Sequence, residues 1–173
     1  MATTEPRTLA EVRDPVGRRY WPGNKGRDGE RTPMQWDATP NAGFTSGEPW
    51  LRVPESAARR SVALEQADAG SILSLVRRVL ALRRASVALR RGAYTAIDTD
   101  PRVFAYRRTA GGESRIVALN TSAERVPIEL GLAPGARVVV STLRPQSEPP
   151  RAARALALEP FEGVVLEAGG RAP

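Results

Sequence analysis

The segment from Gly26 to Trp50 holds most of the side chains in this chain whose types could recognise a substrate. Its sequence is GRDGERTPMQWDATPNAGFTSGEPW. An arginine such as Arg31 presents a planar fork of donors that can hold two hydroxyl groups or one carboxylate at once. Carboxylates and indoles stand close by, among them Asp28 and Trp36. A polar segment of this length inside a compact domain is uncommon and usually functional, so we expect a specific loop rather than a linker.

The composition rules out several catalytic mechanisms and several kinds of metal site. The chain contains no cysteine and no histidine. A disulfide framework, a thiolate metal site and a cysteine nucleophile are therefore excluded. The same holds for Ser-His-Asp and Cys-His catalysis and for a zinc site with histidine ligands. We expect neither a metal nor a cofactor in this protein.

The chain is strongly basic, with a formal net charge of +7. A basic chain raises the question of nucleic-acid binding. Nearly all of the excess is arginine, however, spread along the chain in pairs such as Arg77-Arg78 and Arg90-Arg91, and no helix-turn-helix or RNA-binding motif accompanies it. We therefore interpret the arginines as a solvated surface and expect no nucleic-acid partner.

Nothing in the sequence indicates a membrane protein or a secreted protein. There is no apolar run of about 18 residues, so we expect no transmembrane helix. The first residues, MATTEPRTLAEVRDP, lack the apolar stretch of a secretory signal. Together with the absence of cysteine, this predicts a cytoplasmic location and no membrane partner.

The elements that must position the Gly26–Trp50 segment fall into a loop region followed by one helix. Residues 1–67 are rich in Pro, Gly, Asn, Asp and Ser and keep neither a helical nor a strand period, so their isolated large side chains must anchor on another body. Residues 68–91 predict one helix, with Asp68 as N-cap and Gly92 as its stop. One apolar stripe follows helical spacing, and it consists of Ile72, Leu75, Val76, Val79 and Leu80.

Residues 92–173 change to short alternating segments. Pairs such as Val103/Ala105 and Ile116/Ala118 show the period of two that is typical of half-buried strands. Repeated short strands at this spacing predict an antiparallel β-sandwich. The predicted strands are Ala93–Ile97, Val103–Arg108, Arg115–Asn120, Arg125–Leu130, Arg137–Thr142, Ala153–Leu158 and Val164–Glu167.

Several motifs in residues 14–50 point to one known family. The chain contains Asp14-Pro15, then Tyr20-Trp21-Pro22, Lys25-Gly26-Arg27-Asp28, Arg31-Thr32-Pro33-Met34-Gln35-Trp36, Asn41-Ala42-Gly43-Phe44 and Pro49-Trp50. This series closely resembles the DP…WP..KGRDG, RTPMQW, NAGF and PW runs of α-glucosidases and oligo-1,6-glucosidases in the α-amylase superfamily, glycoside hydrolase family 13. The helix SILSLVRRVLALRRASVALRRGAY and the strands VFAY and IVALN are similar to the C-terminal part of the same enzymes.

The resemblance covers essentially the whole chain and implies a mixed α and β fold. Residues 1–67 would be the barrel-end loop region at the rim of the active site. Residues 68–91 would be the last helix of a (β/α)8 barrel, and residues 92–173 the C-terminal antiparallel β-sandwich domain.

The resemblance also implies an activity, the retaining cleavage of α-glucosidic bonds by an Asp nucleophile and a Glu acid/base. In the family these carboxylates lie at the ends of barrel strands that precede the GRDG loop. Here only about 25 residues precede that loop. We therefore expect no catalytic residue in this chain, which would be a C-terminal fragment that is inactive alone. An α-glucoside oligosaccharide would bind only if a barrel is supplied, for example by a partner chain.

The family motif assigns roles to a few residues of the loop. Arg31 is at the position that reaches the sugar bound beside the catalytic carboxylates, so the resemblance makes it the substrate-binding residue. Arg27 and Asp28 are expected to pin the loop by ion pairs. Trp36 and Asp37 are likewise expected to structure the loop, with Trp36 as an anchor on the barrel.

Two alternatives stay open. One is a standalone carbohydrate-binding or interaction module built on the β-sandwich, which needs a surface platform of aromatic side chains. Phe104 and Tyr106 share strand parity and could lie on one face, with Tyr94 and Phe161 as the other aromatic residues of this region. The other alternative is a piece of a trehalose-synthase-like enzyme, because the same loop motif occurs in that branch of the superfamily.

Overall fold

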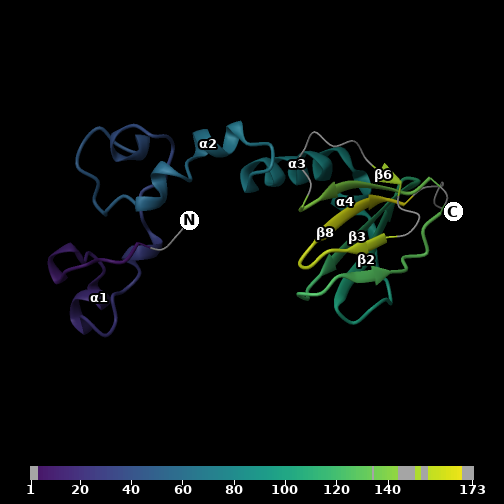
Figure 1. The fold of residues 1–173 in the computed structure, drawn as a ribbon, viewed down its shortest axis with the longest axis horizontal. Coiled ribbons are helices and arrows are strands. Elements are labelled where there is room, and N and C mark those ends of the chain that lie inside the picture. The colour runs from purple at the N-terminus through teal and green to yellow at the C-terminus, as the bar shows by residue number, and fades with distance from the viewer. Residues whose placement is uncertain (1–3, 134, 144–150, 153–155, 169–173) are drawn as a thin grey trace. The chain divides into compact units, whose positions relative to one another are not determined.

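A computed structural model of the chain describes residues 4–133, 135–143, 151–152 and 156–168 (Figure 1). The chain divides into two compact units, Met1–Leu73 and Ser74–Pro173. The first consists of loops and short helices, whereas the second combines helices with two antiparallel sheets. The fold is therefore of the mixed α and β class. No helix within the described ranges is long and apolar enough to span a membrane.

The first unit has short helices that the sequence pattern did not reveal. Its α-helices are α1 (Pro15–Tyr20) and α2 (Val62–Ala67), and its 3-10 helices are η1 (Leu9–Glu11), η2 (Asp28–Glu30), η3 (Pro40–Gly43) and η4 (Glu55–Ala58). None is long enough to show a persistent apolar period. Capping side chains start the two α-helices: Asp14 accepts from the first turn of α1, and the Ser61 hydroxyl accepts from Leu64 N in α2.

The helix predicted over residues 68–91 is two helices, α3 (Ile72–Ala85) and α4 (Val87–Arg91). Ser86 separates them because its backbone is extended and its hydroxyl accepts from Leu89 N at 3.1 Å, which makes it the N-cap of α4. The prediction of Asp68 as N-cap was wrong, because α3 begins four residues later. Asp68 instead stabilises a turn, in which its Oδ1 accepts from Gly70 N and its carbonyl from Ser71 N.

The second unit contains one large and one small sheet, both antiparallel. The six-stranded sheet has the order β1-β2-β3-β8-β5-β6, and β4 pairs with β7 in the other. The strands are β1 (Ala93–Ala96), β2 (Val103–Ala110), β3 (Glu113–Asn120), β4 (Val126–Ile128), β5 (Arg137–Ser141), β6 (Arg151–Ala152), β7 (Leu156–Leu158) and β8 (Gly163–Glu167). All seven predicted strands have a counterpart, although residues 153–155 of the Ala153–Leu158 prediction lie outside the described residues.

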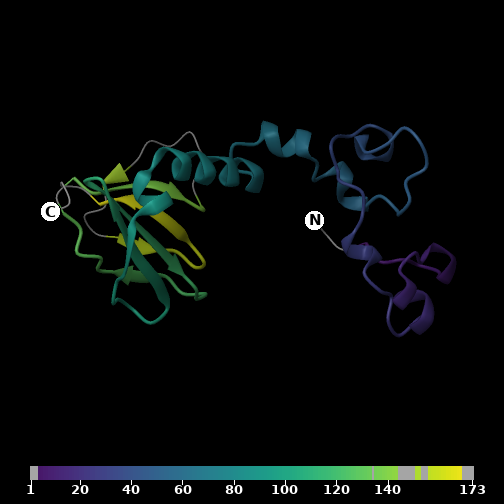
Figure 2. The ribbon, with the colours of Figure 1, turned by 180° about the vertical axis from the view of Figure 1, so that it is seen from behind.

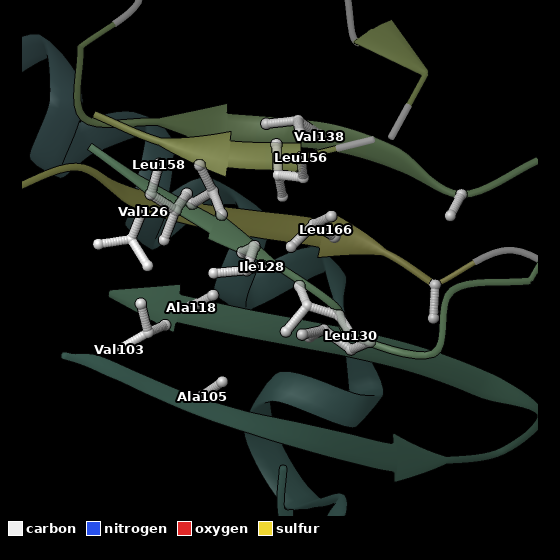
Figure 3. Close-up of a cluster of buried hydrophobic side chains, with 14 residues drawn as sticks. Val103, Ala105, Ala118, Val126, Ile128, Leu130, Val138, Leu156, Leu158 and Leu166 are labelled. Atoms are coloured by element: carbon white, nitrogen blue, oxygen red, sulfur yellow. The ribbon is translucent and has the colours of Figure 1, made fainter. Parts of the chain in front are cut away.

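One apolar core lies between the two sheets (Figure 3). Side chains from the inner face of the six-stranded sheet, such as Ile116 and Leu166, meet Val126 and Leu158 from the small sheet, and all four are fully buried. The alternation seen in the sequence is therefore a true division between core and surface. Seen from behind, α4 packs on β2 and β3 (Figure 2), where Ala88 N donates to Glu113 Oε2 at 3.0 Å.

Candidate functional site

The Asp14 carboxylate accepts hydrogen bonds from two separate segments of the first unit. It is buried, and its Oδ1 accepts hydrogen bonds from Val16 N at 2.8 Å and Gly17 N at 3.3 Å, with Pro15 at the first helical position. Its Oδ2 accepts from Arg27 N at 3.4 Å. One carboxylate thus caps α1 and holds the start of the Gly26–Trp50 segment.

The backbone approaches Asp14 so closely that only glycine fits at position 26. Gly26 has φ +72°, and an added Cβ would lie 2.7 Å from both Cβ and Cγ of Asp14. A Cβ on Gly17 would lie 2.5 Å from the carbonyl oxygen of Lys25. The two glycines therefore allow the Lys25–Asp28 run to lie directly against α1.

Two guanidinium groups flank the Asp14 carboxylate. The Nη1 atom of Arg31 lies 3.7 Å from Asp14 Oδ2, and the Nε atom of Arg27 lies 3.9 Å from the same oxygen. Burial raises the pKa of Asp14, but the three main-chain hydrogen bonds and the charge of Arg31 outweigh it and lower the pKa below its ordinary value. Asp14 is therefore ionised at neutral pH and serves as the counter-ion of both arginines.

The Arg31 side chain keeps most of its hydrogen-bonding capacity. It is 43% exposed, and its contact with Asp14 is longer than a hydrogen bond. Among the described residues, the only ion pair of Arg31 is the one with Asp14. The carboxylate orients the guanidinium by charge while its donor fork stays available to a ligand.

Asp28 fixes the main chain by hydrogen bonds and not by the kind of ion pair that the family motif predicts. It is buried, and its Oδ2 accepts from Arg13 N at 2.6 Å and Asp14 N at 2.9 Å. Arg27 pairs with Asp14 instead. The Oδ1 atom of Asp28 is buried and receives no hydrogen bond within the described part of the chain. A buried acceptor is costly to leave unpaired. We call Asp14, Arg27, Asp28 and Arg31 the Asp14 cluster, and this oxygen is its buried acceptor without a donor among the described residues.

Trp36 and Asp37 belong to a second, separate structure in the loop. The Asp37 carboxylate accepts from Thr39 N at 2.8 Å and from the Thr39 hydroxyl, which lower its pKa, the side-chain bond more than the main-chain bond. Gly43, at φ +66°, lies against this carboxylate, which is 2.6 Å from where its Cβ would be. The main chain closes the turn, because Trp36 N donates to the Ala42 carbonyl at 2.8 Å.

The large apolar side chains of the loop are not buried within their own unit. Trp36 is 50% exposed and Trp50 is 54% exposed, and both Phe44 and Met34 are exposed as well. The backbone around them is nevertheless ordered by internal hydrogen bonds, for example from the Asn41 amide to the carbonyls of Thr45 and Gly47. These exposed side chains are therefore held by an ordered backbone.

The structure brings three of the five predicted loop residues together. Arg27, Asp28 and Arg31 surround Asp14, whereas Trp36 and Asp37 lie in the second turn structure. Asp14 belongs to the Asp14-Pro15 motif, to which the family resemblance assigns no role. An Asp directly before a Pro is the pattern of an N-cap followed by proline at N1, and that signal could have identified it. Within the described residues, no group of three or more Asp and Glu side chains could hold a metal ion.

The Asp14 cluster lies within a region that matches a known enzyme family. The family described as "Alpha amylase, catalytic domain" matches residues 6–92. A probable alpha-glucosidase of Rhizobium meliloti is 39% identical over 120 residues, which are 69% of this chain and 22% of that protein. A trehalose-6-phosphate hydrolase of Escherichia coli is 34% identical over 142 residues, which are 82% of this chain and 25% of that protein.

Solved structures give the same result for almost the whole chain. The crystal structure of a trehalulose synthase from Pseudomonas mesoacidophila has a TM-score of 0.71 at 29% identity, over 95% of this chain and 33% of that one. The matched proteins include glycoside hydrolases, and this chain belongs to the α-amylase family, glycoside hydrolase family 13. It spans about a quarter of the length of the curated relatives described above and a third of the solved enzyme.

Proposed function

We propose that this chain is the C-terminal part of a retaining α-glucosidase that cleaves α-glucosidic bonds of oligosaccharides. Residues 1–67 form the rim of the active site, residues 68–91 the end of the catalytic barrel, and residues 92–173 the β-sandwich domain. The family match at residues 6–92 and the Rhizobium meliloti relative named probable alpha-glucosidase support this assignment.

The geometry of Arg31 is the observation that carries the proposal. A sugar offers pairs of neighbouring hydroxyl groups, and a guanidinium can donate to both members of a pair. Asp14 orients the guanidinium of Arg31 at 3.7 Å without consuming its donor fork. Arg27 holds the same carboxylate at 3.9 Å but its backbone N–H is also fixed there, which suits a structural role.

We also propose that the chain is inactive by itself. Retaining cleavage needs two carboxyl groups about 5 Å apart, one to attack the sugar and one to protonate the leaving group. The three aspartates of this region are already engaged by donors, because Asp14 and Asp28 accept from the main chain and Asp37 accepts from Thr39. The nucleophile and the acid/base would come from a polypeptide that carries the catalytic barrel.

The exposed face of α3 supports such a partner. Its residues Ile72, Val76 and Val79 are 74%, 46% and 38% exposed, although their spacing is that of a buried stripe. We propose the cytoplasm as the location and no nucleic acid or membrane as a partner.

A second candidate is a piece of an enzyme that transfers the glucosyl group instead of hydrolysing it. The similarity to a trehalulose synthase over 95% of the chain favours this candidate. The same Arg31 would then bind the sugar, and the difference would appear in the products.

The experiment is complementation with a matched barrel fragment. The alpha-glucosidase of Rhizobium meliloti, cut before the segment that matches this chain, would be mixed with the full chain and supplied with isomaltose, maltose or sucrose. Each fragment alone should release no glucose and the mixture should release it, whereas transfer would yield an isomeric disaccharide. Activity of the chain alone, or a mixture that associates but stays inert, would contradict the proposal.

Arg31 has a matched control in Arg27, the same residue type with the same acidic partner. Arg31→Ala should lower kcat/KM of the complemented enzyme about 10- to 100-fold, the value of losing hydrogen bonds to a charged donor. Arg27→Ala should change it less than Arg31→Ala. Equal effects of the two substitutions would show that Arg31 acts only through loop structure.

A further inference from the structure

Three aromatic rings form a continuous cluster on the outer face of the six-stranded sheet. Tyr94 lies on β1, and Phe104 and Tyr106 lie on β2. The ring centroids of Tyr94 and Tyr106 are 5.3 Å apart with an interplanar angle of 29°, and those of Phe104 and Tyr106 are 5.6 Å apart at 53°. We call these three residues the aromatic cluster.

Strand register explains why the cluster forms. Ala96 lies opposite Tyr106 and Tyr94 lies opposite Arg108, so Tyr94 is the diagonal neighbour of Tyr106 across the β1–β2 pair. Diagonal neighbours on one face are within reach when the side chains are aromatic. The small side chain of Ala96 leaves the space beside Tyr106 to the Tyr94 ring.

The aromatic cluster is turned away from the core. Val103 and Ala105, the residues of β2 on either side of Phe104, are buried between the sheets, whereas Phe104 is 51% exposed and Tyr94 is 52% exposed. Half-exposed rings that already pack against one another lose little further freedom when a ligand covers them. The cluster is therefore a preformed apolar surface.

The surroundings of the cluster are uncharged except at one end. Leu119 lies opposite Phe104 and Val117 lies opposite Tyr106, which extends the surface over β3. At the other end, Arg108 lies opposite Tyr94, and its Nε donates to the Ala88 carbonyl at 3.5 Å, which leaves the Nη groups for a ligand. Arg115, opposite Arg108, is already paired with Glu113 and Glu167. A surface of rings without a run of cations does not suit a phosphate backbone. It suits a neutral ligand with both an apolar face and hydrogen-bonding edges.

We propose that the aromatic cluster is a binding platform for α-linked glucose oligosaccharides, separate in the chain from Arg31. A pyranose ring presents C–H groups on its faces, which pack on aromatic rings, and hydroxyl groups on its edges, which the tyrosine hydroxyls and Arg108 can bind. The assignment of glucose as the sugar rests on the proposed function. The platform would hold a long substrate or product on the second unit.

The test is a titration of the full chain, labelled with 15N, with maltotriose and with isomaltotriose, followed by amide chemical shifts. The shifts should concentrate in residues 93–96, 103–108 and 117–119. Tyr94→Ala and Phe104→Ala should each weaken binding roughly three- to tenfold. Both rings are half exposed, so the variants should keep the fold, and circular dichroism checks this.

Phe161→Ala is the matched control, because Phe161 is 66% exposed on the same unit and lies between β7 and β8, outside the aromatic cluster. It should bind like the wild-type chain. Three results would overturn the proposal: no shifts at saccharide concentrations of tens of millimolar, shifts confined to the first unit, or equal weakening by Phe161→Ala. Concentration-dependent association abolished by Tyr94→Ala, without saccharide binding, would make the cluster a protein interface and would also overturn it.

The titration needs no catalytic partner, so its outcome is independent of complementation. If the saccharides bind at the aromatic cluster but no barrel fragment restores activity, the platform stands and the proposed function fails. If complementation succeeds and the chain binds no saccharide at the cluster, the platform alone is lost.

Discussion

Arg31 Nη1 lies 3.7 Å from Oδ2 of Asp14, a buried carboxylate that also caps helix α1. The candidate sugar-binding arginine is thus tied by charge to the helix cap that precedes it by 17 positions in the chain. The cap, the glycine-dependent approach of the Lys25–Asp28 run and the orientation of Arg31 depend on the same carboxylate. A change at Asp14 should therefore affect both the order of the loop and the binding of a sugar by Arg31.

Substitution of Asp14 should separate its two roles. Asparagine caps helices about as well as aspartate but carries no charge, so Asp14→Asn should keep the amides of Val16 and Gly17 protected and release Arg31. Asp14→Ala should lose both the cap of α1 and the charge pairing with Arg31. Hydrogen exchange of the Val16, Gly17 and Arg27 amides measures the cap. Wild-type protection in Asp14→Ala would mean that the cap does not order this region.

Acid should loosen both the loop of the first unit and the turn at Asp100 that precedes β2 in the second, at pH values below the ordinary aspartate pKa. A carboxylate whose pKa is lowered by folding stabilises the fold above its ordinary pKa, and the stabilisation is lost as the pH falls through the lowered value. Asp14 and Asp37 both behave in this way. Asp100 follows the same rule, because hydrogen bonds from the side chain and then the main chain of Arg102 lower its pKa to about 2.

Carboxyl carbon shifts of these aspartates, recorded between pH 6 and pH 2, measure the pKa values directly. We expect every midpoint below the ordinary aspartate value of about 3.9, with that of Asp100 near pH 2. A midpoint of Asp14 at or above that ordinary value would show that burial outweighs its hydrogen bonds.

Gly26→Ala should destabilise the first unit by more than the cost of placing a non-glycine residue at a positive φ. A non-glycine residue at positive φ costs about 1 to 2 kcal/mol, and the new Cβ would also lie 2.7 Å from Asp14. Gly112→Ala is the control, because Gly112 has φ +77° but nothing within 4 Å of an added Cβ. Free energies of unfolding should show the larger loss for Gly26→Ala, and equal losses would mean that the approach to Asp14 is not tight.

The exposed stripe of α3 should matter for assembly and not for the fold of the chain. Val76 is 46% exposed, so Val76→Asp should leave the free energy of unfolding within about 0.5 kcal/mol of the wild-type value. It should abolish complementation by the barrel fragment, because a charge would enter an apolar interface. Arg77→Asp, an exposed change on the same helix, should not. Loss of activity in both variants would indicate a general effect on α3.

The sequence predicted the strands of the second unit better than the helices. Alternation at Ile116 and Ala118 is read directly from neighbouring residues, and every predicted strand has a counterpart. The break at Ser86 could not be read this way, because serine is tolerated within helices and only its capping bond to Leu89 N identifies the new start. Helices as short as α2 have no period to detect.

The candidate site was predictable in its residues but not in its connections. The loop motif singled out Arg27, Asp28 and Arg31, yet their shared partner Asp14 lies more than ten positions upstream. The aromatic cluster shows the same limit. Strand parity placed Phe104 and Tyr106 on one face, but the contact of Tyr94 with Tyr106 depends on the β1–β2 register, which only the structure supplies.

The most direct test of the central claim is the rate of glucose release when the full chain is mixed with a barrel fragment of a related α-glucosidase. We predict no release by either fragment alone, release by the mixture, and a 10- to 100-fold lower kcat/KM with Arg31→Ala than with the wild-type chain. Glucose release by the chain alone would contradict it. So would a mixture in which the two fragments bind each other and remain inactive.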